Sequence, residues 1–403
     1  MPATVFFASN RILTGDPAVV TSYGPNIQAP SVSTDIIYAT AFVDGVNIKA
    51  DQSGSITSIQ DPNKGAFAAN VASDLSNAGR NLLVFIHGFD NTFEDAITRA
   101  AFNREFLAAS GKPGTDTTVL AFSWPSLGKI FSFPVPDADY RHDQKMASLS
   151  GIHLMSFFAQ IEPLLRTARA NGFRSYLLAH SMGNLALESA VENWFLHGNG
   201  NAELFNVSFL AAGDCGFDAF AQPNLTGLDG LSRLTSRISI YYSGADEVLK
   251  MSQAINSLER LGQDGPKDRT DQAEFPAATY QMFDATAIDD YDRNFLTSHQ
   301  YYRLSPTVRG AIADVWRQCR RRKSGQRRRA KRDELIYYNL VTASSVGGPE
   351  MLLPLIFRVD EWAVALEHFA ERRPALNPFG LDVDVREPDV DVLGPVRDQT
   401  PAQ

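Results

Sequence analysis

The sequence contains only two cysteines, Cys215 and Cys319, in 403 residues. Two cysteines cannot form the disulfide framework of a small secreted protein, and their scarcity fits a reducing compartment. The opening residues MPATVFFASNRILTG have no positively charged leader, and no apolar run approaches the ~18 residues that a membrane helix needs. These absences predict a soluble, cytoplasmic protein without a transmembrane segment.

Sequence motifs for metals and nucleotide cofactors are also missing. No H-E-x-x-H segment or similar cluster of histidines and carboxylates occurs at metal-ligand spacing. Neither the glycine-rich phosphate loop of nucleotide hydrolases nor the glycine fingerprint of dinucleotide-binding folds is found. We therefore expect no metal and no cofactor.

Apolar residues, by contrast, make up 44% of the chain, which is enough for a large buried core. The formal net charge of −9 is unevenly distributed, because Arg317 to Arg332 form a basic arm with ten Lys or Arg residues and no acid. This arm has three interpretations. It is a solvated charge run, a partner site for nucleic acid or an anionic membrane surface, or a clamp on the acidic remainder of the chain.

Between residues 81 and 302, short apolar runs alternate with amphipathic stretches. The runs are NLLVFIHG, TTVLAFSW, RSYLLAHS, NVSFLAAGD, RISIYYSGAD and ATYQMFDA. Nearly continuous apolar runs of this length are typical of parallel strands buried on both faces, and the helical spacing between them predicts crossover helices. The alternation predicts an α/β protein with a mostly parallel central sheet flanked by helices.

The chain is predicted to have three regions. Residues 1–304 form the α/β domain, in which TVFFASNR and STDIIYATAFV are an antiparallel edge hairpin ahead of the parallel strands. Residues 305–373 form a helical C-terminal extension that includes the basic arm, 317–332. Residues 374–403 are rich in Pro, Asp and Val without a helical period, which predicts a disordered tail.

One of the predicted strands leads directly into a serine. In YLLAHSMGN, Ser181 has Ala179 two residues before it and Gly183 two residues after it. A nucleophile elbow needs small residues at both positions, because the sharp turn from strand to helix leaves no room for side chains. Ala179 departs from the usual glycine but is small enough. The alternative is that Ser181 only caps the helix that follows.

A second segment, FIHGFDN, closes an earlier strand and suits an oxyanion hole. Gly88 would let the backbone turn so that the N–H of Phe89 points at the site. The second donor would be the N–H of Met182, directly after the nucleophile. The alternative is an ordinary turn between a strand and a helix.

A carboxylate and a histidine follow Ser181 in the order that such a site requires. Asp246, in YYSGADEVLK, comes after a later strand and would orient the catalytic imidazole, and Asp214, in FLAAGDCGFD, is the alternative acid. Among seven histidines, His299 in NFLTSHQYY lies after the last of these strands and before a helix. Ser181, Asp246 and His299 are therefore predicted to form a catalytic triad.

The loop SWPSLGKIFSFPVPDADYRHD follows the strand that ends at Trp124. Its aromatic residues Trp124, Phe131 and Phe133 are candidates for an apolar substrate pocket beside the nucleophile. The alternative is that these side chains only pack the loop against the body.

The segments LLVFIHGFDNTFEDAITRAAF, AFSWPS, LLAHSMGN, AAGDCGFDAF, YYSGADEVL and SHQYY, with VFFASNR near the N-terminus, resemble an uncharacterised bacterial family of α/β-hydrolases. The similarity covers Thr4 to Tyr302. The resemblance implies the α/β-hydrolase fold and a serine hydrolase, with Ser181, Asp246 and His299 on the family's triad positions. It implies nothing about the extension after residue 304.

These observations favour a serine hydrolase that cleaves a carboxylic ester or a related acyl bond of a small-molecule substrate. An enzyme of this fold with an aspartate nucleophile is disfavoured by Ser181. The alternative function is that of a catalytically weak binding protein of the same fold, which uses the basic arm to hold nucleic acid or an anionic surface. An ester, a thioester and an amide would all use the same machinery.

Overall fold

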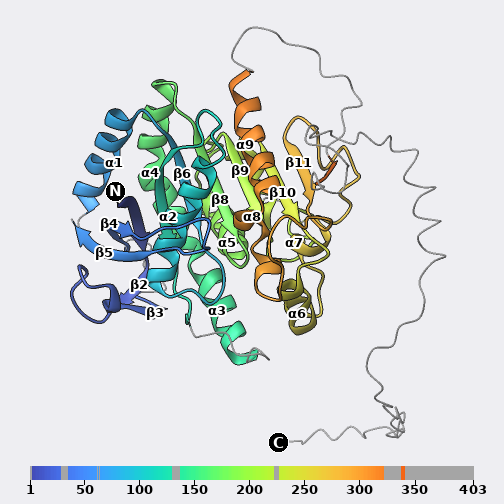
Figure 1. Ribbon diagram of the computed structural model, residues 1–403, viewed down its shortest axis with the longest axis horizontal. Helices are drawn as coiled ribbons and strands as arrows, with labels where there is room; N and C mark the ends of the chain where they lie inside the picture. Colours follow the sequence, from blue (N-terminus) through green and yellow to red (C-terminus); the bar gives the residue numbers. More distant parts are fainter. Residues whose placement is uncertain are drawn as a thin grey trace, which may run out of the picture. The chain divides into compact units, whose positions relative to one another are not determined.

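The predicted apolar runs become neighbouring strands of one ten-stranded sheet in the computed structural model (Figure 1). The structure describes residues 2–28, 35–60, 62, 64–128, 137–221, 227–321 and 337–340. The strands are β1 (Ala3–Ser9), β2 (Arg11–Leu13), β3 (Tyr23–Ile27), β4 (Ile37–Asp44), β5 (Ser55–Gln60), β6 (Asn81–Ile86), β7 (Thr117–Ser123), β8 (Ser175–His180), β9 (Val207–Ala211), β10 (Ile238–Tyr242), β11 (Tyr280–Asp284) and β12 (Tyr337–Asn339). Ten of these strands form the sheet, in the order β12-β11-β10-β9-β8-β6-β7-β1-β4-β5, and β2 pairs with β3 in a separate two-stranded sheet.

The strands from β12 to β1 in this order are all parallel to their neighbours. At the other end of the sheet, β4 pairs antiparallel with both β1 and β5. The two predicted N-terminal strands therefore do pair antiparallel, but they are not an edge hairpin. β1 lies inside the sheet because it also pairs with β7, and the edge strand is β5, which the apolar pattern did not predict because it is largely exposed.

Helices cover both faces of the sheet. They are α1 (Lys64–Ala78), α2 (Phe93–Ala108), α3 (Asp137–Leu149), α4 (Gly151–Ala170), α5 (Gly183–Leu196), α6 (Glu247–Asn256), α7 (Leu261–Asp264), α8 (Tyr301–Leu304) and α9 (Pro306–Arg321), with short 3-10 turns η1 (Val20–Ser22), η3 (Gly227–Arg233) and η4 (Thr297–His299). Thr92 caps α2 through a capping box with Asp95.

The core consists of two apolar layers, one on each face of the sheet. Along β6, Leu82, Val84 and Ile86 face the layer that contains α1, α4 and α5, and the intervening residues face the layer that contains α2, α8 and α9 (Figure 1). Both faces of a parallel strand are therefore buried, which is why these runs are continuously apolar instead of alternating.

The helix predicted after residue 304 packs on the sheet. Trp316 of α9 is 1% exposed and stacks on Tyr176 of β8 with ring centroids 4.2 Å apart. Further along the chain, β12 adds a short parallel strand beside β11. The basic arm lies outside the described residues after Arg321, and so do the rest of the predicted extension beyond Leu340 and the predicted disordered tail.

Within the described part of the chain, no helix has the length and apolar character required to cross a membrane.

Candidate active site

The predicted catalytic residues lie in loops at one edge of the sheet. Ser181 follows β8, Asp246 follows β10, and His299 follows β11 in the turn η4. These strands are parallel, so their carboxyl ends meet at the same edge, which is where open α/β sheets form their ligand sites.

Ser181 has a strained backbone at the turn between β8 and α5. Its φ is 54°, in the left-handed region that L-residues rarely adopt. The neighbouring chain approaches so closely that a Cβ on Gly183 would lie 2.4 Å from the carbonyl oxygen of His87, and a Cβ on Gly88 would lie 2.6 Å from the Cβ of Ser181. A positive φ at the serine and a close approach at the glycine are the local features that the predicted nucleophile elbow requires.

The imidazole of His299 is bound to a carboxylate. Its Nδ1 lies 2.7 Å from Oδ2 of Asp246, and both side chains are buried. The other oxygen of Asp246, Oδ1, accepts the N–H of Leu249 and caps α6. The helix cap and the contact with His299 therefore use different oxygens of one carboxylate, so that the helix N-terminus fixes the orientation of the carboxylate.

The second nitrogen of His299, Nε2, is buried and makes no hydrogen bond with any residue that the structure describes, Ser181 included. The ring of His299 lies 4.8 Å, between centroids, from the ring of His180, the residue directly before Ser181. Contacts between a hydroxyl and its base often tighten only when substrate is bound. Because Nδ1 is bound to Asp246, Nε2 is the ring nitrogen of His299 that is available to accept a proton from a hydroxyl.

The alternative acid, Asp214, has other partners. It accepts hydrogen bonds from the hydroxyls of Tyr140, at 2.9 Å, and Ser252, and it forms a buried ion pair with Arg260. Its own backbone N–H donates to the carbonyl of Ser181 at 3.0 Å. The structure thus brings Asp246, and not Asp214, into contact with His299.

The two predicted oxyanion donors lie on either side of Ser181. Met182 immediately follows Ser181 at the start of α5, and Phe89 lies in the turn after β6, which is paired with β8. Neither backbone N–H donates to an acceptor among the described residues. Backbone N–H groups without a partner of this kind are the donors that an oxyanion hole requires, so Phe89 and Met182 stay candidates for that role.

The predicted pocket residue Trp124 is fully buried. Its ring stacks on His87 at 4.8 Å between centroids, and its indole N–H donates to the carbonyl of His87 at 2.8 Å. These contacts favour the alternative in which Trp124 packs its loop against the body. The other two pocket candidates, Phe131 and Phe133, lie outside the described residues.

Several side chains that hold the site were not found from the sequence. The Nε2 of His180 lies 3.1 Å from the carbonyl of His299, and its ring stacks on Tyr302 at 4.3 Å. The hydroxyl of Tyr301 accepts the N–H of Ala212 and donates to the carbonyl of Tyr241. The one local signal for these roles is the position of the tyrosines, directly after His299 in SHQYY.

Burial favours the neutral form of two histidines close to Ser181, His87 and His180. It lowers the pKa of His87 to about 3, with a further contribution from the positive charge of Arg11, against the effect of two backbone carbonyls. Burial, together with the neighbouring His299, also holds the pKa of His180 well below its usual value. At neutral pH these two side chains act as hydrogen-bonding supports.

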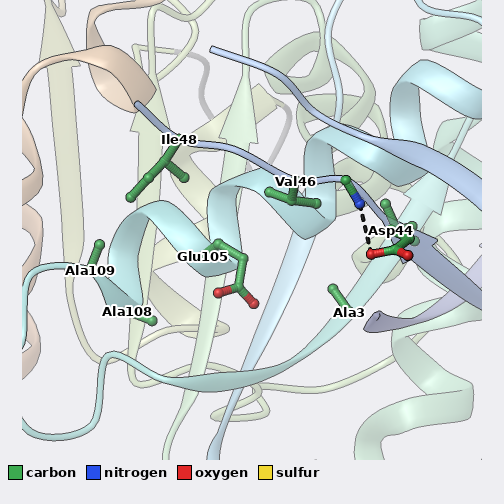
Figure 2. Close-up of a pocket in the computed structure, with 9 residues that line it drawn as sticks. Ala3, Asp44, Val46, Ile48, Glu105, Ala108 and Ala109 are labelled. Atoms are coloured by element: carbon green, nitrogen blue, oxygen red, sulfur yellow. Dashed lines mark hydrogen bonds between the residues drawn. The ribbon is translucent and has the colours of Figure 1, made fainter. Parts of the chain in front are cut away.

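No cluster of three or more His, Cys, Asp or Glu suited to a metal occurs among the residues with described positions. A pocket of about 570 Å³ lies between the start of β1, the end of β4 and the end of α2, and is lined by Ala3, Asp44, Val46, Ile48 and Glu105 among others (Figure 2). The start of β1 and the end of α2 lie at the amino ends of the parallel strands, opposite Ser181. This pocket is therefore separate from the candidate active site.

Residues 63–317 match a protein family described as "Alpha/beta hydrolase of unknown function (DUF900)". A similar solved structure is a hyperthermophilic esterase from the archaeon Pyrobaculum calidifontis. That alignment covers 72% of this chain and 82% of the esterase, with 11% sequence identity and a TM-score of 0.25. No curated protein matches the chain.

Proposed function

This chain belongs to the alpha/beta hydrolases of unknown function, and on that basis we propose that it is a serine hydrolase that cleaves carboxylic esters or related acyl bonds. Membership of the family confirms the predicted fold class and the resemblance seen in the sequence. Serine chemistry, the triad and the ester substrate are our proposal.

In the first half-reaction, the hydroxyl of Ser181 attacks the carbonyl carbon of the substrate while Nε2 of His299 removes its proton. Asp246 holds the imidazole through Nδ1 and stabilises the imidazolium that forms. The N–H groups of Phe89 and Met182 bind the oxygen of the tetrahedral intermediate. His299 then returns the proton to the leaving alcohol, which departs and leaves an acyl group on Ser181.

In the second half-reaction, water attacks the carbonyl carbon of the acyl-enzyme and gives one proton to His299. Collapse of the second tetrahedral intermediate breaks the bond to Ser181, whose oxygen recovers the proton from His299. The products are one alcohol and one carboxylic acid. No metal, redox partner or second substrate other than water is needed for this cycle.

The single observation that carries this proposal is the hydrogen bond of 2.7 Å between Nδ1 of His299 and Oδ2 of Asp246, beside a serine whose φ is 54°. A buried histidine whose Nδ1 is held by a carboxylate presents Nε2 as a base. A strained backbone at a serine persists only where the surrounding structure enforces it, and such strain is concentrated at functional sites.

The test is covalent labelling with a fluorophosphonate probe. We expect the wild-type chain to be labelled and Ser181→Ala not to be labelled, because only an activated serine reacts with this probe. Ser208→Ala is the matched control, since Ser208 is a fully buried serine on the neighbouring strand β9 whose hydroxyl has no hydrogen-bond partner among the described residues. Equal labelling of wild type and Ser181→Ala would remove the assignment.

The substrate class is tested with a panel of p-nitrophenyl acyl esters of increasing chain length, together with matched thioesters and anilides. Esters and thioesters have better leaving groups than amides, so we expect their hydrolysis to be the faster reactions. Turnover that persists undiminished in Ser181→Ala would place the chemistry elsewhere in the molecule.

A further inference from the structure

The turn that carries the N–H of Phe89 is enclosed by buried polar side chains. This oxyanion turn, residues 88–91, connects β6 to α2. Arg11, Ser126 and Asp143 surround the turn, and Asn91 is its last residue. The side chain of each of these four residues is buried, with at most 6% of the residue exposed. Four polar groups buried together are costly unless they are mutually bonded, so their contacts indicate what they stabilise.

Arg11 reaches the turn from β2, in the N-terminal part of the chain. Its Nη2 donates to the carbonyl of Asn91 at 2.8 Å, its Nη1 donates to the carbonyl of Ser126 at 3.0 Å, and its Nε donates to the hydroxyl of Ser123 at 3.0 Å. The planar guanidinium thus joins the loop after β6 to the loop after β7. A lysine ammonium has no such fork of fixed donors.

Asn91 closes the turn from inside. Its side-chain amide donates to the carbonyls of Gly88, at 3.1 Å, and Phe89, at 2.7 Å, and its backbone N–H donates to the hydroxyl of Ser126 at 3.0 Å. The carbonyls on both sides of the Phe89 N–H are therefore bonded, whereas the N–H itself donates to none of the described residues.

Asp143, from α3, binds the other side of the same turn. Its Oδ2 accepts the N–H of Asp90 at 3.2 Å and the hydroxyl of Ser126 at 2.5 Å, and its Oδ1 accepts the N–H of Leu127 at 3.0 Å. Asp90 has a φ of 55°, so the residue next to Phe89 is also held in the left-handed region. One buried carboxylate on α3 thereby binds both the oxyanion turn and the loop after β7.

We infer that Arg11 and Asp143 are positioning residues for catalysis, which hold the oxyanion turn so that the N–H of Phe89 points at the carbonyl oxygen of the substrate. This inference rests on the proposed serine hydrolase function. Arg11 precedes residues 63–317, the part of the chain that matches the family, so a residue outside the match supports the site. On this inference β2, which pairs with β3 outside the ten-stranded sheet, contributes to catalysis.

The size of the expected effect follows from the chemistry of oxyanion holes. Loss of one donor typically lowers kcat by about 10²- to 10³-fold, and a misplacement of about 1 Å can lower the rate by about 10²-fold. Displacement of the turn affects the developing oxyanion more than the bound ester. We therefore expect the loss in kcat, with KM nearly unchanged.

The experiment compares wild type, Arg11→Lys and Asp143→Asn, with kcat expressed per active site titrated with a fluorophosphonate. We expect kcat to fall by about 10-fold or more in both variants, with KM within about threefold of wild type. Ser126→Ala is a milder third variant in case the other two do not fold. Arg237→Lys is the matched control, since it changes a buried arginine at the start of β10, away from the oxyanion turn, and should leave kcat unchanged.

Backbone hydrogen exchange provides a second readout that does not depend on turnover. In Arg11→Lys we expect faster exchange in peptides that cover the oxyanion turn, with unchanged exchange in peptides that cover β10. Unchanged exchange in the turn, or kcat per titrated site within twofold of wild type, would overturn the inference. A wild-type chain that is not labelled by the probe and does not turn over substrate would instead count against the proposed function. The exchange result would still test whether Arg11 positions the turn.

Discussion

At the residue scale, the site depends on positions where no larger side chain fits. Gly183 and Gly88 allow the elbow and the oxyanion turn to approach within van der Waals contact, and Ala179, two residues before the nucleophile, is fully buried in β8. The atoms that a Cβ on Gly183 would meet are backbone carbonyl oxygens of Ile86 and His87, which cannot rotate away. A methyl group there would have to displace a strand of the central sheet.

Gly183→Ala is therefore expected to lower the free energy of unfolding by about 1–3 kcal/mol or more, the usual range for overpacking a core. Gly310→Ala is the matched control, since its Cβ would have no atom within 4 Å and it lies in α9. An alanine in a helix interior is preferred over glycine, so this variant should gain about 0.5–1 kcal/mol. Urea denaturation measures both, and equal stabilities would contradict the close approach at Gly183.

At the scale of elements, the segment from Ser298 to Tyr302 holds His299 by contacts on both sides of it. The hydroxyl of Ser298 accepts the N–H of Glu247 at the start of α6, beside Asp246. Tyr301 joins the ends of β9 and β10 through its hydroxyl, and Tyr302 stacks on His180. One short segment thus anchors His299 beside the residues that follow β8 and β10, Ser181 and Asp246 among them.

Tyr301→Phe removes the hydroxyl that bridges Ala212 and Tyr241, and leaves a buried N–H and a buried carbonyl with one partner fewer. The Ala212 N–H still donates to the Tyr241 carbonyl at 3.1 Å, so we expect the free energy of unfolding to fall by about 0.5–1.5 kcal/mol, and kcat to fall because the His299 segment loses an anchor. Tyr241→Phe is the control, since the hydroxyl of Tyr241 is buried without a hydrogen-bond partner among the described residues. That change should be neutral or stabilising, and denaturation with kcat measured in parallel distinguishes the two variants.

At the scale of the whole molecule, the fold buries neutral imidazoles behind its active site. His87 and His180 are at most 3% exposed, and the pKa of each lies well below its usual value because burial disfavours the charged form. Above about pH 6.5 a histidine is neutral in both the folded and the unfolded chain and adds no pH dependence. Below that pH the unfolded chain binds protons that the folded chain excludes, so stability falls as the pH falls.

For His87 the effect extends from about pH 6.5 down to its folded pKa of about 3. Each such group lowers the free energy of unfolding by up to about 1.4 kcal/mol per pH unit. His87→Gln keeps an amide donor beside the carbonyls but cannot titrate, so the dependence of stability on pH should become shallower by about 1 kcal/mol per unit between about pH 6 and pH 4.

The exposed His197 supplies the control variant, His197→Gln, which should leave the slope as in wild type. Chemical denaturation at several pH values measures the slope. An unchanged slope in His87→Gln would mean that His87 is protonated in the folded chain.

Much of the fold was determined by local patterns in the sequence. The runs that became β6 to β11 are apolar on both faces because helices cover both sides of a parallel sheet, and the α/β-hydrolase class follows from that pattern together with the resemblance, and is confirmed by the family match. The order Ser181, Asp246, His299 along the chain is likewise a local property, since Ser181 and Asp246 closely follow recognisable strands and His299 lies in the segment after the last predicted strand. By contrast, β5 was not predicted, because an exposed edge strand has no such apolar pattern.

Only the tertiary structure decided which residues meet. It separated Asp246, which binds His299, from Asp214, which binds Arg260, although both follow apolar strands in the same way. It also brought Arg11 to the turn at Asn91, 80 positions away in the chain. The physical reason is that side-chain periodicity reports which face of an element is buried, whereas a hydrogen bond between distant loops depends on sheet order and on distances of a few ångströms, which no local pattern encodes.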